Sequence, residues 1–162
     1  MADRIESKIH GLDELQRNLK RIRQDGKDLT SPFKIIGRHM IGSINRNFKV
    51  EGRPVKWIQS RRAEEEGGQT LRDKGTLKNS IFSKVYKHKI QFGSNLKYAA
   101  VHQYGFSGTV SVPEHSRKTK YGSTRVRAHS RRMRLPARPF IVFQKFDRDY
   151  ILYTISEALR KR

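Results

Sequence analysis

The sequence predicts an α+β protein, with a small antiparallel sheet packed by two or three helices and a long basic arm. Two observations predict it. Apolar residues recur every three to four positions in some stretches and every second position in others, which favours helices and strands in one chain. Residues 107–138 hold nine lysines and arginines against one acid, Glu114, and few apolar side chains. Because 162 residues suit one domain, we expect a single domain over 1–162 with its arm at 107–138.

The composition indicates a modest core and acidic or polyanionic partners. Hydrophobic residues make up 35% of the chain, and 36 lysines and arginines against 15 acids give a formal charge of +21. Such an excess favours nucleic acid or acidic protein surfaces, and charge alone does not choose between them. The absence of cysteine excludes disulfides, thiol catalysis and cysteine-bound zinc. No apolar run approaches the roughly 20 residues that cross a bilayer, so we expect no membrane partner.

Helical periodicity predicts helices near 13–24, 31–48 and 144–160. In the second of these, Ser31 is a candidate N-cap and Pro32 suits the first helical position, where a missing amide costs nothing. We expect Gly37 and Gly42 to let another element pack closely against this helix. The predicted apolar faces of the second and third helices are Phe33, Ile36, Met40, Ile44 and Phe48, and Phe143, Phe146, Tyr150, Ile151, Ile155 and Leu159.

Alternating patterns predict four strands in one antiparallel sheet, near 5–9, 81–86, 89–93 and 98–103. We expect the two central strands to bury Phe82, Tyr86, Ile90 and Phe92. The stretch 50–73 has no sustained period and predicts a long loop. Thr76 is a candidate cap for a short turn through Ser80.

The basic stretch 107–138 predicts an extended arm or long hairpin. It cannot bury enough apolar surface to become ordered in isolation, so we expect it to become ordered against a partner. No internal repeat is evident in the chain. The residues expected to contact the partner are Arg117, Lys118, Lys120, Arg125, Arg127, Arg131, Arg132 and Arg134.

The string YAAVHQYG, from Tyr98 to Gly105, invites a catalytic interpretation of His102, but a general base also needs a nucleophile and an orienting partner. No GxSxG, GxGxxG or GxxxxGK[ST] pattern is present. The six histidines show no HxxxH spacing, and His115 and His129 lie among cations that disfavour a metal. We therefore expect no enzyme, no cofactor and no metal, with His102 and Gln103 hydrogen-bonding to backbone or neighbours.

The string LPARPF, from Leu135 to Phe140, has two prolines around an Ala-Arg pair. Each proline fixes its own φ and pushes the preceding residue to extended geometry. We expect a stiff spacer that directs Arg138 and seats Phe140 at the edge of the core.

These two strings, with Trp57 and LRDKGTLKNSI from Leu71, resemble the phage virion morphogenesis or tail completion proteins of Mu-like, contractile-tailed phages. The resemblance runs from about Ile5 to the C-terminus. The residues of this chain that match it, expected to serve the fold or an interface, are Trp57, Leu71, Gly75, Leu77, Tyr98, His102, Gln103, Gly105, Pro136, Arg138, Pro139 and Phe140.

The resemblance implies a structural protein of the virion tail or neck, assembled in the host cytoplasm. It implies a ring, of six copies, that completes the tail or joins it to the head. Its partners would be copies of itself and acidic surfaces of tail tube and neck proteins, with contact to packaged DNA left open. Two alternatives remain at this point: a basic nucleic-acid-binding module, and a small ribonuclease toxin using His102 and Tyr104. Tail terminator and neck protein are not separated by the sequence.

Overall fold

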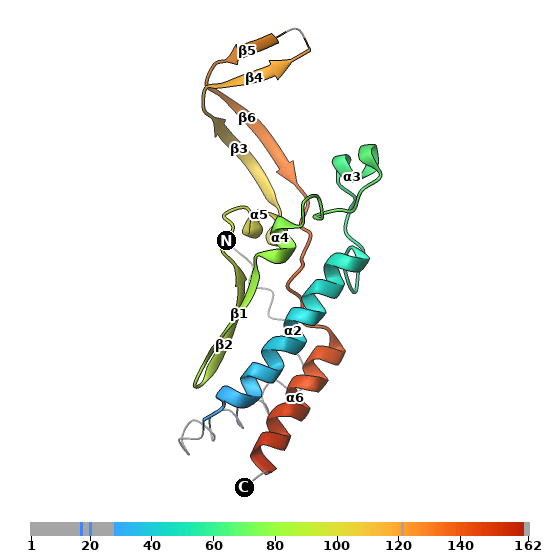
Figure 1. Ribbon diagram of the computed structural model, residues 1–162, viewed down its shortest axis with the longest axis vertical. Helices are drawn as coiled ribbons and strands as arrows, with labels where there is room; N and C mark the ends of the chain where they lie inside the picture. Colours follow the sequence, from blue (N-terminus) through green and yellow to red (C-terminus); the bar gives the residue numbers. More distant parts are fainter. Residues whose placement is uncertain (1–16, 18–19, 21–27, 121, 161–162) are drawn as a thin grey trace. The chain divides into compact units, whose positions relative to one another are not determined.

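The computed structural model describes Arg17, Lys20, residues 28–120 and residues 122–160 (Figure 1). The predicted strand at 5–9 lies outside the described residues. Of the predicted helix at 13–24 only Arg17 and Lys20 are described, and both are helical. No helix in the described part is long and apolar enough to cross a membrane.

The fold is α+β, as predicted, and its described elements are helices joined to two-stranded sheets. The helices are α2 (Thr30–Val50), α3 (Arg61–Glu66), α4 (Thr76–Asn79), α5 (Ala99–Tyr104) and α6 (Lys145–Arg160). The strands are β1 (Ile81–Tyr86), β2 (Lys89–Ser94), β3 (Phe106–Val112), β4 (His115–Thr119), β5 (Gly122–Val126) and β6 (His129–Leu135). The sheets pair β1 with β2, β3 with β6 and β4 with β5. The prediction of one four-stranded sheet is therefore wrong for the described residues, in which β1 and β2 pair only with each other.

Contacts along the backbone divide the chain into two compact units. The first takes the described residues up to Ser43, Phe82–Phe92 and the chain from Phe143 on. The second takes Ile44–Ile81 and Gly93–Val142. Helix α2 therefore supplies residues to both units. That 1–162 form a single domain stays a prediction.

The core of the first unit is formed by one face of α2 with α6 and the β1–β2 hairpin. Phe33, Ile36 and Met40 of α2 are buried, as predicted, beside Ile155 of α6. Ile90 and Phe92 of β2 pack against this cluster, which also follows the prediction. A Cβ on Gly37 would lie 3.1 Å from the Ser83 hydroxyl, so this glycine does allow close approach of another element. A Cβ on Gly42 would meet nothing within 4 Å among the described residues, so the expectation is wrong for Gly42.

The start of α2 and the face of β1 differ from prediction. The helix begins at Thr30 rather than after Ser31, and the Asp28 carboxylate accepts the Thr30 amide hydrogen bond at 2.8 Å. In β1 the half-buried positions are Ile81, Ser83 and Val85, while Phe82 and Tyr86 are exposed. The prediction chose the larger aromatic side chains, and a shift of one residue exchanges the two faces of a strand.

Helix α6 buries fewer of its predicted residues than expected. Ile155 is buried and Ile151 and Leu159 pack on the core, but Phe143 and Phe146 are 54% and 63% exposed. The deepest anchor of α6 is polar. Asp147 is buried, and its carboxylate accepts hydrogen bonds from the Ser43 hydroxyl at 2.7 Å and the Gln144 amide at 3.0 Å, and lies 2.9 Å from His39 Nε2.

Three further predictions for the second unit were wrong. The stretch 98–103 is not a strand: α5 occupies it, because Ala99 and Ala100 favour helix and Gly105, at φ 77°, ends it. The predicted loop 50–73 contains α3, which Ser60 caps by accepting the Ala63 amide and Gly67 ends at φ 68°. The cap of α4 is Gly75, not Thr76.

The core of the second unit surrounds three aromatic rings. Phe48 lies 5.7 Å from Trp57 and 5.4 Å from Phe140, measured between ring centroids. All three side chains are buried, so Phe140 belongs to the core itself and not to its edge. The other buried apolar residues of this unit are Ile44, Ala63, Leu77 and Ala99.

The basic stretch is a long antiparallel hairpin, as predicted (Figure 1). The chain goes out through β3 and β4 and returns through β5 and β6. The two ladders keep one register, since Val112 opposes His129 and His115 opposes Val126, three residues further along both strands. The strands are interrupted at Pro113 and again at residues 127–128. Proline has no amide to give to a ladder, which explains the first break.

The Asp147 network yields a stability prediction. Asp147→Ala removes the acceptor of buried hydrogen bonds from α2 and from the start of α6, so we expect a loss of about 2–4 kcal/mol in the free energy of unfolding. Urea denaturation of the variant and the unchanged protein measures it. Asp149→Ala is the matched control, because Asp149 is exposed and its nearest cation, Arg148, lies 3.9 Å away. A control that lost as much as Asp147→Ala would contradict the role given to this network.

Candidate functional site

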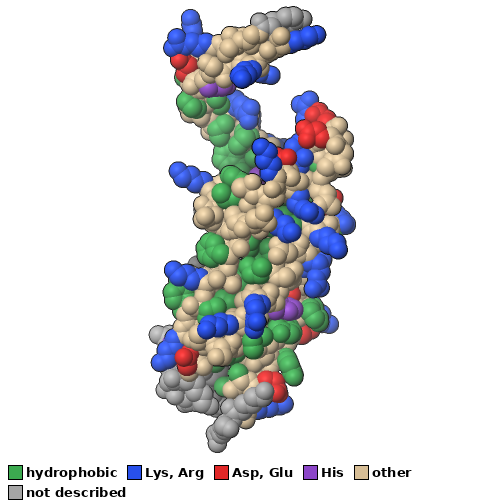
Figure 2. Space-filling model, viewed as in Figure 1, with side chains coloured by type: hydrophobic (Ala, Val, Ile, Leu, Met, Phe, Trp, Pro, Cys, Tyr) green, Lys and Arg blue, Asp and Glu red, His purple; other side chains and the backbone are tan. Residues whose placement is uncertain are grey.

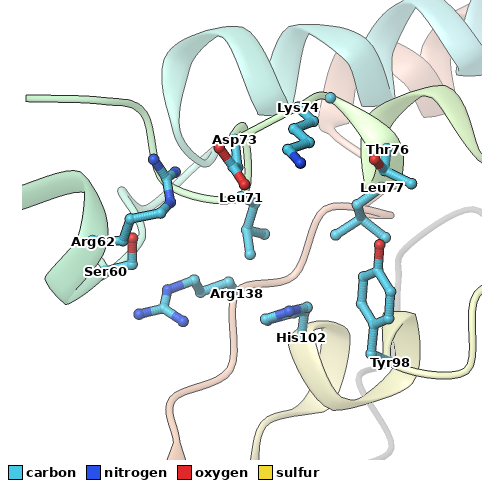
Figure 3. Close-up of a pocket in the computed structure, with 11 residues that line it drawn as sticks. Ser60, Arg62, Leu71, Asp73, Lys74, Thr76, Leu77, Tyr98, His102 and Arg138 are labelled. Atoms are coloured by element: carbon cyan, nitrogen blue, oxygen red, sulfur yellow. The ribbon is translucent and has the colours of Figure 1, made fainter. Parts of the chain in front are cut away.

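Six of the twelve residues matched by the family resemblance lie around one pocket of about 300 Å³ in the second unit (Figure 3). They are Leu71, Gly75, Leu77, Tyr98, His102 and Arg138. The remaining lining residues are Ser60, Arg62, Asp73, Lys74 and Thr76. These side chains come from α3, α4 and α5 and from the loops beside them, so residues distant in the sequence converge on one small cavity.

Arg138 connects the pocket to the loop after Trp57. Its side chain is 5% exposed, its Nε donates to the Ile58 carbonyl at 2.8 Å, and its Nη2 donates to the Gln59 carbonyl at 3.4 Å. Burial lowers the pKa of Arg138 below its ordinary value, yet an arginine stays charged. Within the described residues no carboxylate forms an ion pair with it. Its visible role is to hold two backbone carbonyls.

His102 lies beside Arg138 in the pocket and has an unusual environment. Its backbone carbonyl accepts the Arg138 amide at 2.7 Å, and its ring lies edge-on to Tyr98 at 5.8 Å. Its ring Nδ1 is buried and, among the described residues, has no hydrogen-bond partner. Of the hydrogen bonds expected for His102, the one through its backbone carbonyl is present, and none is made by ring Nδ1. Burial, with the positive charge of Arg138, lowers the pKa of His102 below its ordinary 6.5.

The pocket does not assemble a nucleophile with a base. Ser60 lines it, but the Ser60 hydroxyl caps α3 by accepting the Ala63 amide. No cluster of three or more potential metal ligands occurs in the described part of the chain. A loop residue in the left-handed region, Leu71 at φ 60°, marks the rim as locally strained.

The other matched residues build the wall that carries Arg138. Gln103 Oε1 accepts the amides of Phe140 and Ile141, and its Nε2 donates to the Ile141 carbonyl, all at 3.0 Å. Trp57 Nε1 donates to the Pro139 carbonyl at 3.0 Å. A Cβ on Gly105 would lie 2.9 Å from the Ala137 amide nitrogen, so only glycine fits this turn beside the strand end. Pro136 is half-buried in the same wall.

The basic arm presents its cations on different faces. Arg132 opposes Thr109 and Arg134 opposes Ser107, so both lie on the polar face of the β3–β6 ladder. Arg131 opposes Val110 on the other face. Lys and Arg side chains lie over the β4–β5 end in Figure 2, while acidic side chains gather over α3. On the arm, Arg125 pairs with Glu114. The remaining predicted contacts are exposed: Arg117, Lys118, Lys120 and Arg127.

The arm also contains a repeat that the sequence analysis missed. Residues 112–118 read VPEHSRK and residues 126–132 read VRAHSRR, so valine, histidine, serine and arginine recur at a spacing of fourteen. The valine, histidine and arginine of both copies line one groove of about 410 Å³, formed by Val112, His115, Arg117, Val126, His129 and Arg131. The signal was visible in the spacing of the two histidines, which had been assessed only for metal binding.

Comparison with known proteins decides the family. A profile of the phage virion morphogenesis family matches residues 11–160. The chain belongs to this family. It is 27% identical over 153 residues to Mu-like prophage FluMu G protein 2 of Haemophilus influenzae, a match that covers 94% of each chain. No solved structure matches it. The family is one of virion morphogenesis and not a known enzyme family, so the protein is a phage morphogenesis protein associated with the virion.

Gln103 gives a direct test of the wall. Gln103→Ala removes three hydrogen bonds to the backbone of Phe140 and Ile141, and we expect a loss of about 2–3 kcal/mol in the free energy of unfolding. Chemical denaturation measures it. Gln91→Ala, at an exposed position of β2, is the control and should change stability by less than about 0.5 kcal/mol. Equal losses of stability in Gln103→Ala and Gln91→Ala would argue against the role given to the Gln103 hydrogen bonds.

His102 gives a test through pH. Because its pKa is lowered in the folded protein, the unfolded chain binds more protons once the pH falls below about 6.5. The contribution of His102 to stability is therefore fully present above pH 6.5 and is lost progressively as the pH falls through the folded pKa. We expect His102→Gln to lose less stability than the unchanged protein between pH 7.5 and pH 5.5, measured by urea denaturation. The other histidines are common to both proteins, so identical pH slopes would refute the assignment.

Proposed function

We propose that the protein forms a ring, of six copies, that completes the phage tail and joins it to the neck, and that the arm, from β3 to β6, holds each copy to an acidic surface of the neighbouring subunit. Membership of the virion morphogenesis family supports an assembly role. The relative in Haemophilus influenzae carries a Mu-like prophage name, which is consistent with a contractile-tailed phage. The exposed strands of the arm and its positive charge support a contact between the arm and an acidic protein surface.

The proposal rests mainly on one observation: the end of the arm has no hydrophobic core of its own. All five residues of β4 are exposed, as are four of the five in β5. A two-stranded hairpin in water is marginally stable at best. The arm therefore needs a second surface, and a neighbouring subunit supplies one in a closed ring, where the contact runs head to tail from copy to copy.

The charge of the arm favours a carboxylate-rich protein surface over DNA. The stretch 107–138 has a net charge of +8, from nine cations and Glu114. Arg138 is buried in the pocket wall, so the arm itself offers the remaining cations to a partner. DNA must slide through a tail during ejection, and a ring of phosphate-binding arginines would oppose sliding. Arginine pairs bidentately with carboxylate, which suits a permanent joint.

Charge reversal on one face of the arm tests the proposal. Arg132→Glu with Arg134→Glu places acids on the polar face of β6 without touching the aromatic core. We expect the double variant to remain folded by circular dichroism but to run as a monomer in size-exclusion chromatography with light scattering, where the unchanged protein runs as a ring. If exposed charges hold the ring together, the oligomer of the unchanged protein should dissociate in high salt, because salt screens contacts between exposed charges.

Lys34→Glu with Arg38→Glu is the matched control, because both residues are exposed on α2 and the change in net charge is the same. The control should keep the oligomer. A monomeric unchanged protein, or an oligomer that survives reversal of the arm, would count against the proposal. Particles in which these arginines contacted DNA in the channel would favour the nucleic-acid alternative.

A further inference from the structure

The repeated Val-x-x-His-Ser-Arg segments form two matching half-sites in the arm. In the ladders, Val112 opposes His129, and Val126 opposes His115, so each valine of one copy faces the histidine of the other. Exchanging the two copies leaves this pairing unchanged. The groove they line therefore has an approximate two-fold symmetry, with one histidine and one arginine in each half.

Both histidines are held in the same way. His115 Nδ1 lies 3.0 Å from the Pro113 carbonyl, and His129 Nδ1 lies 3.0 Å from the Arg127 carbonyl. A carbonyl oxygen only accepts, so Nδ1 carries a proton in both rings. This leaves Nε2 of each ring for a ligand, where a protonated imidazole donates a second hydrogen bond. Two rings fixed by the same backbone contact indicate a built site and not scattered surface charge.

The two arginines complete the half-sites. Arg117 and Arg131 are exposed, and no carboxylate of the described residues forms an ion pair with either one. Each guanidinium can bind a carboxylate through two parallel hydrogen bonds. Val112 and Val126 are half-buried and give the groove an apolar component that fits the methylene groups of an acidic side chain.

We propose that this groove binds two carboxylates from one acidic segment of a protein partner, one in each half-site. The inference rests on the proposed function in that the arm must meet a protein neighbour, and it names the chemistry of that contact. A volume of about 410 Å³ accommodates two acidic side chains but not a folded element. The groove offers no Phe, Tyr or Trp among its lining residues for stacking nucleic-acid bases.

The experiment measures binding of a fluorescein-labelled octaglutamate peptide to the full chain by fluorescence anisotropy at 0.15 M salt. We expect Arg117→Gln and Arg131→Gln each to weaken binding about tenfold, and by the same factor, because each removes one of two equivalent half-sites. Arg38→Gln is the matched control, since it makes the same change at an exposed position of α2 outside the arm, and it should change binding less than twofold. Octaglutamine should not bind.

A second measurement locates the peptide. The ring proton signals of His115 and His129 should shift together on addition of octaglutamate, and those of His88, exposed in the turn between β1 and β2, should not. Equal weakening by Arg38→Gln would reduce the groove to general charge attraction and overturn the inference. Unequal losses of affinity in Arg117→Gln and Arg131→Gln would also overturn it. So would tighter binding of a twelve-nucleotide single-stranded DNA than of octaglutamate, if the same two substitutions weakened the binding of that DNA.

These outcomes are separable from the test of the ring. An arm that holds the oligomer through Arg132 and Arg134 while octaglutamate ignores the groove refutes only the groove. A groove that binds octaglutamate with two equivalent half-sites, in a protein that never forms a ring, refutes only the proposed assembly.

Discussion

The second unit depends on pairing the buried backbone between Arg138 and Ile141. This stretch cannot join a ladder, because Pro139 lacks an amide and both prolines of LPARPF restrict their neighbours. Buried backbone groups must nevertheless find partners. Side chains supply them: Gln103 binds both sides of Ile141, Asn47 donates to the Phe140 carbonyl at 2.9 Å, and Trp57 donates to the Pro139 carbonyl. One short segment thereby ties α2, α5 and the loop after α2 together.

That constraint explains why so many of the residues matched by the family resemblance converge. Arg138 is held at both ends, by its own amide on the His102 carbonyl and by its guanidinium on the loop at Ile58. Gly105 must turn the chain where a side chain would meet Ala137. The matched residues outside the pocket position the matched residues inside it. What these matched residues share is a place in or beside one hydrogen-bonded wall, more than a chemical role.

Sequence reasoning succeeded where one periodic pattern dominated, as in the face of α2 from Phe33 to Phe48. It failed where local signals were balanced. The segment of α5 has aromatic and β-branched residues that suggest a strand, yet two alanines and the turn at Gly105 favour a helix. In β1 both faces carry apolar residues, so only packing against α2, through Ser83 at Gly37, chooses the register. The pocket was out of reach, because its walls come from segments that only the fold brings together.

In the arm, general attraction for acidic partners and specificity for one partner have different structural causes. An excess of cations attracts any polyanion, which explains why composition left protein and nucleic acid open. The groove adds what charge lacks, namely fixed imidazoles, two guanidinium groups at equivalent positions and an apolar component. Because the end of the arm has no core of its own, ordering it costs free energy that a partner must offset. General charge brings a partner near, and the duplicated half-sites then determine which acidic segment is held well enough to order the arm.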